Sequence, residues 1–416
     1  MKTFSEQVLL SFLYLLVVSQ SIPVHQDTGH NNYAILFDAG SSGTRMEIYK
    51  FLASGPSLQP SDVVQIDASP DKVKPGISDL SDDPTQVEAY MNPLLKSAKQ
   101  TIPEDKQAST PIFLLATAGM RLLPEDQANA ILDEVRKLFN DKEKCPFLFK
   151  NDNDVRIITG KVEGIYGWVT VNFLLGVFAS KNSNSYGSLD LGGASHQNSM
   201  DFDKSSPEVV VFDVAGKTYS VFSRSYLGYG QDQAREKYLA YIAQKANCAE
   251  DSKCVMQSPC HNNGFKESLE YQDKESIFKG TAEVKQCREI IRELFFCKSC
   301  PFNDQPNLKG KFYAFSAFYY VLTDIGAVCS DCEENTINPG KIRESSESFC
   351  EKDYSEVSED PFAKDNCFGA NYIYELLTEG YGLSGLKKIT VTNSLNGFSL
   401  GWTLGGVLHN TGILNE

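Results

Sequence analysis

Beyond its first 21 residues, the chain lacks any hydrophobic run long enough to cross a membrane. The one apolar stretch near its start, residues 8–18, is shorter than the roughly 18 residues that a membrane-spanning helix needs. Lys2 precedes this stretch and the small residues 19–21 follow it, a layout typical of a secretory signal peptide. We therefore expect residues 1–21 to be removed and the mature protein to be secreted, without a membrane anchor.

Basic residues are also scarce, because 39 Lys and Arg stand against 54 Asp and Glu, for a net charge of −15 at pH 7. A nucleic-acid-binding protein needs a basic patch or stripe, and none is visible in the sequence. Nucleic acid is therefore not an expected partner. If the ligand is itself a polyanion, metal ions and backbone N–H groups must offset its charge.

Cysteine is almost absent from the first half of the chain, where Cys145 stands alone. The other ten cysteines lie between residues 248 and 367. In a secreted protein such a cluster indicates about five disulfides, which leaves Cys145 unpaired. The two C-x2-C units at 297–300 and 329–332 also fit a single zinc site, although the export signal favours disulfides.

Apolar runs alternate with helical patterns along the rest of the chain. Residues 111–123 predict a strand that enters a turn of small residues, and Pro124 then opens a helix. Residues 155–160 predict a further strand, and 160–176 predict a helix despite their glycines. The segment 245–367 is expected to be rich in loops. Strands that alternate with helices indicate an α/β architecture.

One local pattern occurs twice, as DAGSSGTR from Asp38 and as DLGGASHQ from Asp190, 152 positions later (190 − 38). Each copy follows an apolar strand; a single copy would fit a hairpin turn without function. Small residues let backbone N–H groups converge on a phosphate, and carboxylates hold hard divalent cations directly or through water. The repeat therefore predicts two duplicated lobes across a cleft, with Asp38 and Asp190 holding a metal between two phosphate-binding hairpins.

Five motifs then make a resemblance specific. DAGSSGTR, ATAGMRLL, GKVEGIYGWVTVNFLLG, DLGGASHQ and GWTLGG occur in the order of the five conserved regions of apyrases. From about residue 33 to 408 the chain resembles the ecto-nucleoside triphosphate diphosphohydrolases. This resemblance implies an α/β, two-lobed actin/hexokinase-like (RNase H-like) fold with an active-site cleft between the lobes. We expect one lobe from 30–160 plus about 398–416, and a disulfide-rich lobe from 161–397.

The resemblance also assigns roles to individual residues. Glu163 matches the general base that takes a proton from the attacking water, and Ser195 and Gln197 match the residues that hold this water. Asp38 and Asp190 match the carboxylates that bind Ca²⁺ or Mg²⁺ through coordinated waters. The aromatic residue that stacks on the base is matched by Tyr320. The phosphate-binding positions are Ser41, Ser42, Gly43, Thr44, Thr117, Ala118, Gly192, Gly193 and Ala194.

Among the cysteines, the resemblance implies the pairs Cys260–Cys287 and Cys350–Cys367. Cys297 is the substitute for a partner of Cys300 that this chain lacks. Cys329–Cys332 and Cys248–Cys254 complete a local scheme, although sequence alone does not determine connectivity.

The implied function is a secreted, metal-dependent hydrolase that cleaves the terminal phosphate of nucleoside tri- and diphosphates with water. One alternative is a nucleoside diphosphatase that prefers UDP or GDP. Alternatives of another class are an ATP-driven conformational module and a nucleotide-binding protein. Gly43 stands where cell-surface members carry His, so the pocket gains little from a third phosphate. We therefore expect kcat/KM for diphosphates within about tenfold of that for triphosphates.

Overall fold

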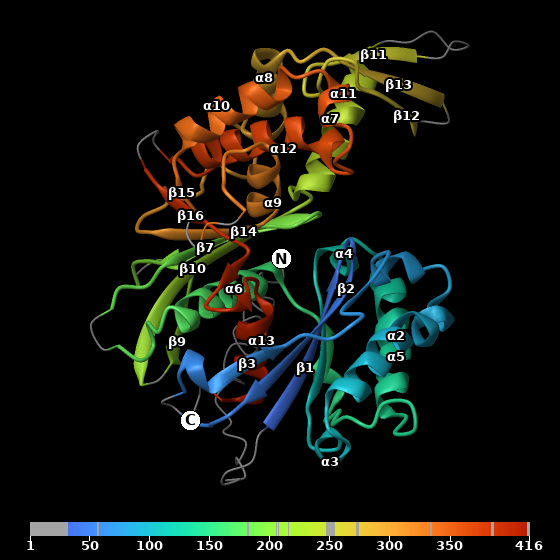
Figure 1. The fold of residues 1–416 in the computed structure, drawn as a ribbon, viewed down its shortest axis with the longest axis vertical. Helices are drawn as coiled ribbons and strands as arrows, with labels where there is room; N and C mark the ends of the chain where they lie inside the picture. The colour runs from blue at the N-terminus through green and yellow to red at the C-terminus, as the bar shows by residue number, and fades with distance from the viewer. Residues whose placement is uncertain are drawn as a thin grey trace, which may run out of the picture. The chain divides into compact units, whose positions relative to one another are not determined.

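The first of two large β-sheets is built around an antiparallel hairpin (Figure 1). The computed structural model describes residues 32–413, apart from 56–57, 181–182, 205, 207, 215, 247–253, 272–273, 331, 333–334 and 384–386. The strands of this sheet are β1 (Asn32–Gly40), β2 (Gly43–Phe51), β3 (Val63–Ile66), β4 (Lys72–Val73), β5 (Ile112–Ala116) and β6 (Val155–Ile157). They follow the order β3-β2-β1-β5-β6, and β4 pairs with β2.

The second large sheet repeats this arrangement. Its strands are β7 (Gly187–Leu191), β8 (Ser195–Asp201), β9 (Val209–Val214), β10 (Lys217–Leu227), β14 (Phe312–Ser316), β15 (Asn335–Ile337) and β16 (Ile389–Val391). Within the order β15-β16-β14-β7-β8-β10-β9, the hairpin β7–β8 corresponds to β1–β2. An antiparallel third strand flanks each hairpin on one side, and two parallel strands continue each sheet on the other. The predicted duplication of the hairpin is therefore confirmed, and it extends to both sheets.

Helices cover both faces of each sheet, so the central strands are buried on both sides. The helices are α2 (Val87–Thr101), α3 (Glu104–Gln107), α4 (Ala118–Arg121), α5 (Glu125–Asn140), α6 (Gly160–Leu174), α7 (Gln231–Lys245), α8 (Val284–Phe295), α9 (Ala317–Asp324), α10 (Pro339–Cys350), α11 (Tyr354–Val357), α12 (Ala363–Glu375) and α13 (Thr403–Thr411). Helices α2 and α5 run along one face of the first sheet (Figure 1), where they bury its odd-numbered β1 side chains. The second sheet packs its outer face on α7, α8, α9, α10 and α12.

Helices α6 and α13 form the layer between the two sheets. Their side chains share one core with Leu36 of β1 and with Tyr313 of β14. The helix α6 is apolar on nearly all sides, which is typical of a fully buried helix. Its glycines allow this packing: a Cβ at Gly164 would lie 2.5 Å from the Ser223 Oγ of β10. The division into lobes at residues 160 and 398 stays a prediction, because residues 32–416 form one compact unit.

The segment 245–367 is not the loop-rich region that we expected. It contains α8, α9, α10 and α11, and a small sheet of the strands β11 (Cys254–Ser258), β12 (Lys266–Tyr271) and β13 (Lys274–Gly280). The prediction failed because α10 buries Ser345 and Ser346 together with Ile342 and Phe349, so its inner face is partly polar. The helical periodicity of this buried face is not apparent when only apolar residues are counted.

Disulfides and a polar network join the helices of this segment. Cys260–Cys287, Cys297–Cys300, Cys329–Cys332 and Cys350–Cys367 are disulfides, as predicted. Within each C-x2-C unit the two sulfur atoms are thus bonded to each other, which contradicts the zinc alternative. Cys254 is disulfide-bonded, but Cys248, its predicted partner, lies outside the described residues. Cys145 is free and buried.

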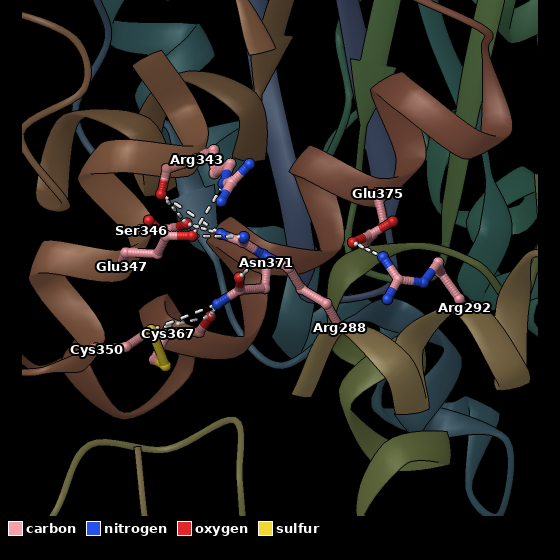
Figure 2. Close-up of polar contacts among 9 residues, drawn as sticks. All are labelled: Arg288, Arg292, Arg343, Ser346, Glu347, Cys350, Cys367, Asn371 and Glu375. Carbon is pink, nitrogen blue, oxygen red and sulfur yellow. Dashed lines mark hydrogen bonds and ion pairs between the residues drawn. A yellow bond between two sulfur atoms is a disulfide. The ribbon is translucent and has the colours of Figure 1, made fainter. Parts of the chain in front are cut away.

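Figure 2 shows how α8, α10 and α12 are held together by Arg288. Its guanidinium donates hydrogen bonds to Asn371 Oδ1 at 2.7 Å, to Glu347 Oε1 at 2.8 Å and to Ser346 Oγ at 2.9 Å. Asn371 in turn donates to the Cys367 carbonyl at 2.8 Å, beside the Cys350–Cys367 disulfide. One arginine of α8 therefore satisfies polar groups of both α10 and α12.

The expected signal peptide, residues 1–21, lies outside the described residues. Among the residues that the structure describes, none of the helices has the length and apolar character needed to cross a membrane.

Candidate active site

Two aspartates project from the centres of the two sheets toward the layer that contains α6. In β1, Asp38 alternates with residues that face α2 and α5, so it shares the opposite face with Leu36. In β7, Asp190 likewise alternates with Leu189 and Leu191, which face the outer helices. The repeated hairpins thus direct one carboxylate each toward the same interior layer.

Both carboxyl groups have strongly raised pKa values. Burial, with the charges of Glu163 and Asp190, raises the pKa of Asp38 to about 8, although Arg45 partly offsets the effect. Burial and the charge of Glu163 raise the pKa of Asp190 to about 7. The effect of one charge on the pKa of another group weakens with distance. Asp38, Asp190 and Glu163 therefore form one group of interacting charges.

Glu163 occupies the first turn of α6, whose Thr159 cap accepts a hydrogen bond from the Val162 N–H. The residue is 7% exposed, and its side chain forms an ion pair with Arg121, Nη2 to Oε2, at 2.7 Å. Burial raises the pKa of Glu163, and Arg121 lowers it by charge and hydrogen bonding; the net direction is upward. A carboxylate whose pKa is raised is a stronger base than an exposed carboxylate, so Glu163 is suited to accept a proton.

A chain of hydrogen bonds extends from Glu163 to the second hairpin. The Arg121 Nη2 that contacts Glu163 also donates to Ser195 Oγ at 3.2 Å. Gln197 Nε2 donates to the same Ser195 Oγ at 2.8 Å and to Ser225 Oγ at 3.2 Å. Ser195 and Gln197 are nearly fully buried, at 3% and 2% exposure. The three residues predicted to act on water are thus linked in space, and Arg121 joins them.

His196, which lies between Ser195 and Gln197 in sequence, faces the other way. It stacks on Tyr226 and Phe302, and the Tyr381 hydroxyl lies 2.8 Å from its Nδ1. Burial lowers the pKa of His196 to about 3, so the ring stays neutral. This residue therefore supports the core behind β8 and is kept away from the carboxylates.

The residues around Asp38 and Asp190 fit a divalent cation. Asp38 Oδ1 is enclosed and has no hydrogen-bond partner. Arg45 opposes the raised pKa of Asp38 only in part, and Mg²⁺ or Ca²⁺ would supply further positive charge to both carboxylates. In the described part of the chain, no three His, Cys, Asp or Glu side chains converge as direct metal ligands. Two carboxylates plus water and phosphate oxygens is the ligand set that suits Mg²⁺.

The predicted phosphate-binding residues lie in the turns that follow the two aspartates. Gly40–Gly43 and Leu191–Ser195 close the hairpins, and Thr117 caps the short helix α4 behind the first hairpin. Thr44 is fully buried and its hydroxyl accepts a hydrogen bond from Tyr90 at 3.1 Å. Ser42 is exposed.

Gly43 has a crowded environment. A Cβ on this residue, whose φ is +156°, would lie 2.6 Å from the Val73 carbonyl oxygen and 2.7 Å from Lys72 Cε. The space beside Gly43 is therefore occupied by β4. A His at position 43 would displace this strand.

Tyr320 lies on α9 and is 54% exposed, so its ring is free to stack on a flat ligand. Its contact within the protein is an edge-on one with Tyr319, at 5.5 Å between ring centroids.

Sequence reasoning missed two residues of the site. Arg121 was inside the quoted ATAGMRLL motif, but its partner Glu163 follows 42 residues later, which no periodicity reveals. Asp232 begins α7, where its N–H donates to the Gly193 carbonyl at 2.9 Å and supports the second hairpin. Burial raises the pKa of Asp232, and Arg235 partly offsets this shift.

Comparison with solved structures is consistent with this architecture. Nucleoside triphosphate hydrolases from Neospora caninum superpose with a TM-score of 0.69 at 14% identity, over 93% of each chain. A Ppx/GppA family protein of Aquifex aeolicus gives 0.52 at 15% identity, over 92% of this chain and 98% of that one. These neighbours have the actin/hexokinase-like fold, so the predicted fold class is confirmed.

Sequence comparison identifies the family. Ectonucleoside triphosphate diphosphohydrolase 1 of Rattus norvegicus is 31% identical, covering 92% of this chain and 81% of the relative. Ectonucleoside triphosphate diphosphohydrolase 5 of Bos taurus is 33% identical (94% and 90%), and the nucleoside diphosphate phosphatase ENTPD5 of Homo sapiens is 32% identical (91% and 87%). The model of the GDA1/CD39 (nucleoside phosphatase) family matches residues 24–415. The predicted enzyme class is thus confirmed, and the chain belongs to the GDA1/CD39 family.

Proposed function

We propose that this protein hydrolyses the terminal phosphate of nucleoside tri- and diphosphates with a divalent cation, and that it acts after secretion. The observation that carries the proposal is the hydrogen-bonded chain of Glu163, Arg121, Ser195 and Gln197 beside Asp38 and Asp190. His196, which adjoins this group in sequence, is stacked on Tyr226 and Phe302 in the core, which favours direct attack by water over a phosphohistidine intermediate.

In this mechanism Glu163 accepts a proton from water. Ser195 and Gln197 orient that water, since their side chains meet at one oxygen, Ser195 Oγ. Backbone N–H groups of the two glycine-containing hairpins hold the phosphate oxygens. A divalent cation held by Asp38 and Asp190, through its waters, would neutralise phosphate charge. Arg121 lowers the pKa of Glu163 and so opposes the effect of burial, which favours the ionised form that acts as base.

Diphosphates and triphosphates should both be substrates. The relatives with similar identity include proteins named for triphosphate and for diphosphate hydrolysis, so similarity alone favours neither. A catalytic group that acts on the terminal phosphate binds whichever phosphate is terminal. We expect kcat/KM for ADP or UDP within about tenfold of the matching triphosphate, a difference of about 1.4 kcal/mol.

The decisive experiment is a phosphate-release assay with ATP, ADP, UTP, UDP and GDP, with and without a chelator. We expect many turnovers per protein without an acceptor, loss of activity in chelator, and recovery with Mg²⁺ or Ca²⁺. Glu163→Gln should keep the melting temperature and nucleotide binding but lose at least about 10²-fold in kcat. Activity of this variant within threefold of wild type would remove Glu163 from the role of base.

A further inference from the structure

Lys72 lies beside Gly43, the residue at the start of β2 that has no side chain. Its Cε is 2.7 Å from the position of a Cβ on Gly43, and Lys74 Cγ is 3.4 Å from the same point. The lysine therefore fills the space into which a side chain at position 43 would project. The sequence did not predict this contact between Lys72 and the space beside Gly43, because Lys72 is part of no motif.

The strand pairing gives Lys72 a defined direction. Asp38 of β1 pairs with Arg45 of β2, and Arg45 pairs with Lys72 of β4. Directly opposed residues on antiparallel strands project from the same face of a sheet. Asp38, Arg45 and Lys72 thus form one row on one face of the sheet, which begins at the carboxylate proposed above to hold the cation and ends beside the hairpin turn.

The strand that carries Lys72 is firmly attached. The Met46 N–H donates to the Asp71 carbonyl at 2.6 Å, and the Tyr90 hydroxyl donates to the Pro75 carbonyl at 2.6 Å. These bonds anchor both sides of β4 to the first half of the molecule. Lys72 is half-buried, so its position depends on this scaffold.

The cations of this row have no close ion-pair partner among the described residues, although the carboxylates of Asp38, Glu47 and Asp71 act on them from a greater distance. In the described part of the chain, the ammonium groups of Lys72 and Lys74 form no ion pair, and Arg45 Nε is enclosed without a hydrogen-bond partner. Unpaired cations next to one another repel, and a bound anion would offset this cost. In a protein with a net charge of −15, such a cluster marks a place for a negatively charged ligand.

We propose that Lys72 is a substrate-binding residue whose ammonium contacts the terminal phosphate of the nucleotide at the first hairpin. This inference rests on the phosphohydrolase function proposed above. A lysine from β4 then supplies the contact that Gly43 cannot make, and it does so equally for tri- and diphosphates, because both present a terminal phosphate there.

The test compares Lys72→Met, which removes the charge and keeps the length, with Lys72→Arg and with Lys50→Met. Lys50 is the matched control, since it lies on β2 at the far end of the β1–β2 hairpin, over the Tyr33 ring. Lys72→Met should lose at least about tenfold in kcat/KM for ATP and for ADP, the loss typical of a contact with a charged group. Its KM and its inhibition constant for orthophosphate should rise, whereas a purely structural defect would leave both unchanged.

Lys72→Arg should recover most of the activity, and Lys50→Met should stay within about twofold of wild type. If Lys72→Met fails to fold, Lys72→Gln replaces it. The inference is overturned if KM and orthophosphate inhibition do not change, if Lys50→Met loses as much, or if only one nucleotide class is affected. If wild type releases no phosphate from any nucleotide, the proposed function fails instead. Stabilisation by orthophosphate of wild type but not of Lys72→Met would then still support the inference, and its absence would overturn it.

Discussion

Arg121 connects the candidate base to the residues that hold water, because a single Nη2 contacts both Glu163 and Ser195. We regard it as a positioning residue that also sets the charge of Glu163. In Arg121→Gln the lowering effect of the guanidinium on the Glu163 pKa is lost, so that pKa should rise further. The acidic limb of the kcat/KM profile should then move to higher pH, with a lower maximum. An unshifted limb would show that Arg121 acts only through packing.

The raised pKa values of Asp38 and Asp190 make stability depend on pH. In the unfolded chain both groups titrate near 3.8, but in the folded protein they titrate at about 8 and about 7. Between these values the folded state binds more protons, so the free energy of unfolding falls as pH rises. In chelator, the melting temperature should decrease from pH 5 to pH 8, and a divalent cation should restore more at pH 8. The double variant Asp38→Asn, Asp190→Asn should flatten this slope; an unchanged slope would contradict the assignment.

Among the elements, α8, α10 and α12 depend on Arg288 for their mutual packing (Figure 2). Arg288→Met leaves the buried Asn371 Oδ1 without the Arg288 donor and removes one of the two hydrogen bonds of Ser346 Oγ, which keeps its bond to the Arg343 carbonyl. It should lower the free energy of unfolding by roughly 2 kcal/mol or more. Arg343→Met is the control, because Arg343 contacts the same Glu347 from a more exposed position. It should cost less than about 1 kcal/mol. Denaturant unfolding curves measure both, and equal losses would contradict a special role for Arg288.

The hairpins and the helix α6 are the elements that carry the site, and the sequence predicted each of them. An apolar run followed by Asp and small residues specifies a strand and a turn by local chemistry alone. The neighbour of the first hairpin, β4, could not be predicted, since two residues of strand carry no periodic signal. The residue that occupies the space beside Gly43 comes from this strand, about 30 residues further along, and the sequence did not reveal it.

For the whole molecule, the state of Cys145 reports on global unfolding. This thiol is unpaired, as expected, but it is fully buried, and burial raises its pKa to about 11. Without reductant, the native protein should therefore take up no alkylating reagent, and the denatured protein should take up one equivalent. Mass spectrometry of native and denatured samples measures this. More than one modified thiol after denaturation would contradict the disulfide scheme.

Taken by itself, the sequence determined the fold class, the family and the duplicated hairpins, and its resemblance to the apyrases implied the disulfide pairs that the described residues form. These features follow from local patterns or from ordered motifs, which remain readable without knowledge of distant contacts. The tertiary structure alone decided that Arg121 meets Glu163, that His196 turns into the core, and that Lys72 covers Gly43. Each of these depends on which strands pair and which faces of α6 and β8 are buried. Such pairings join residues far apart in the chain, because the energy that selects them comes from packing across the two sheets.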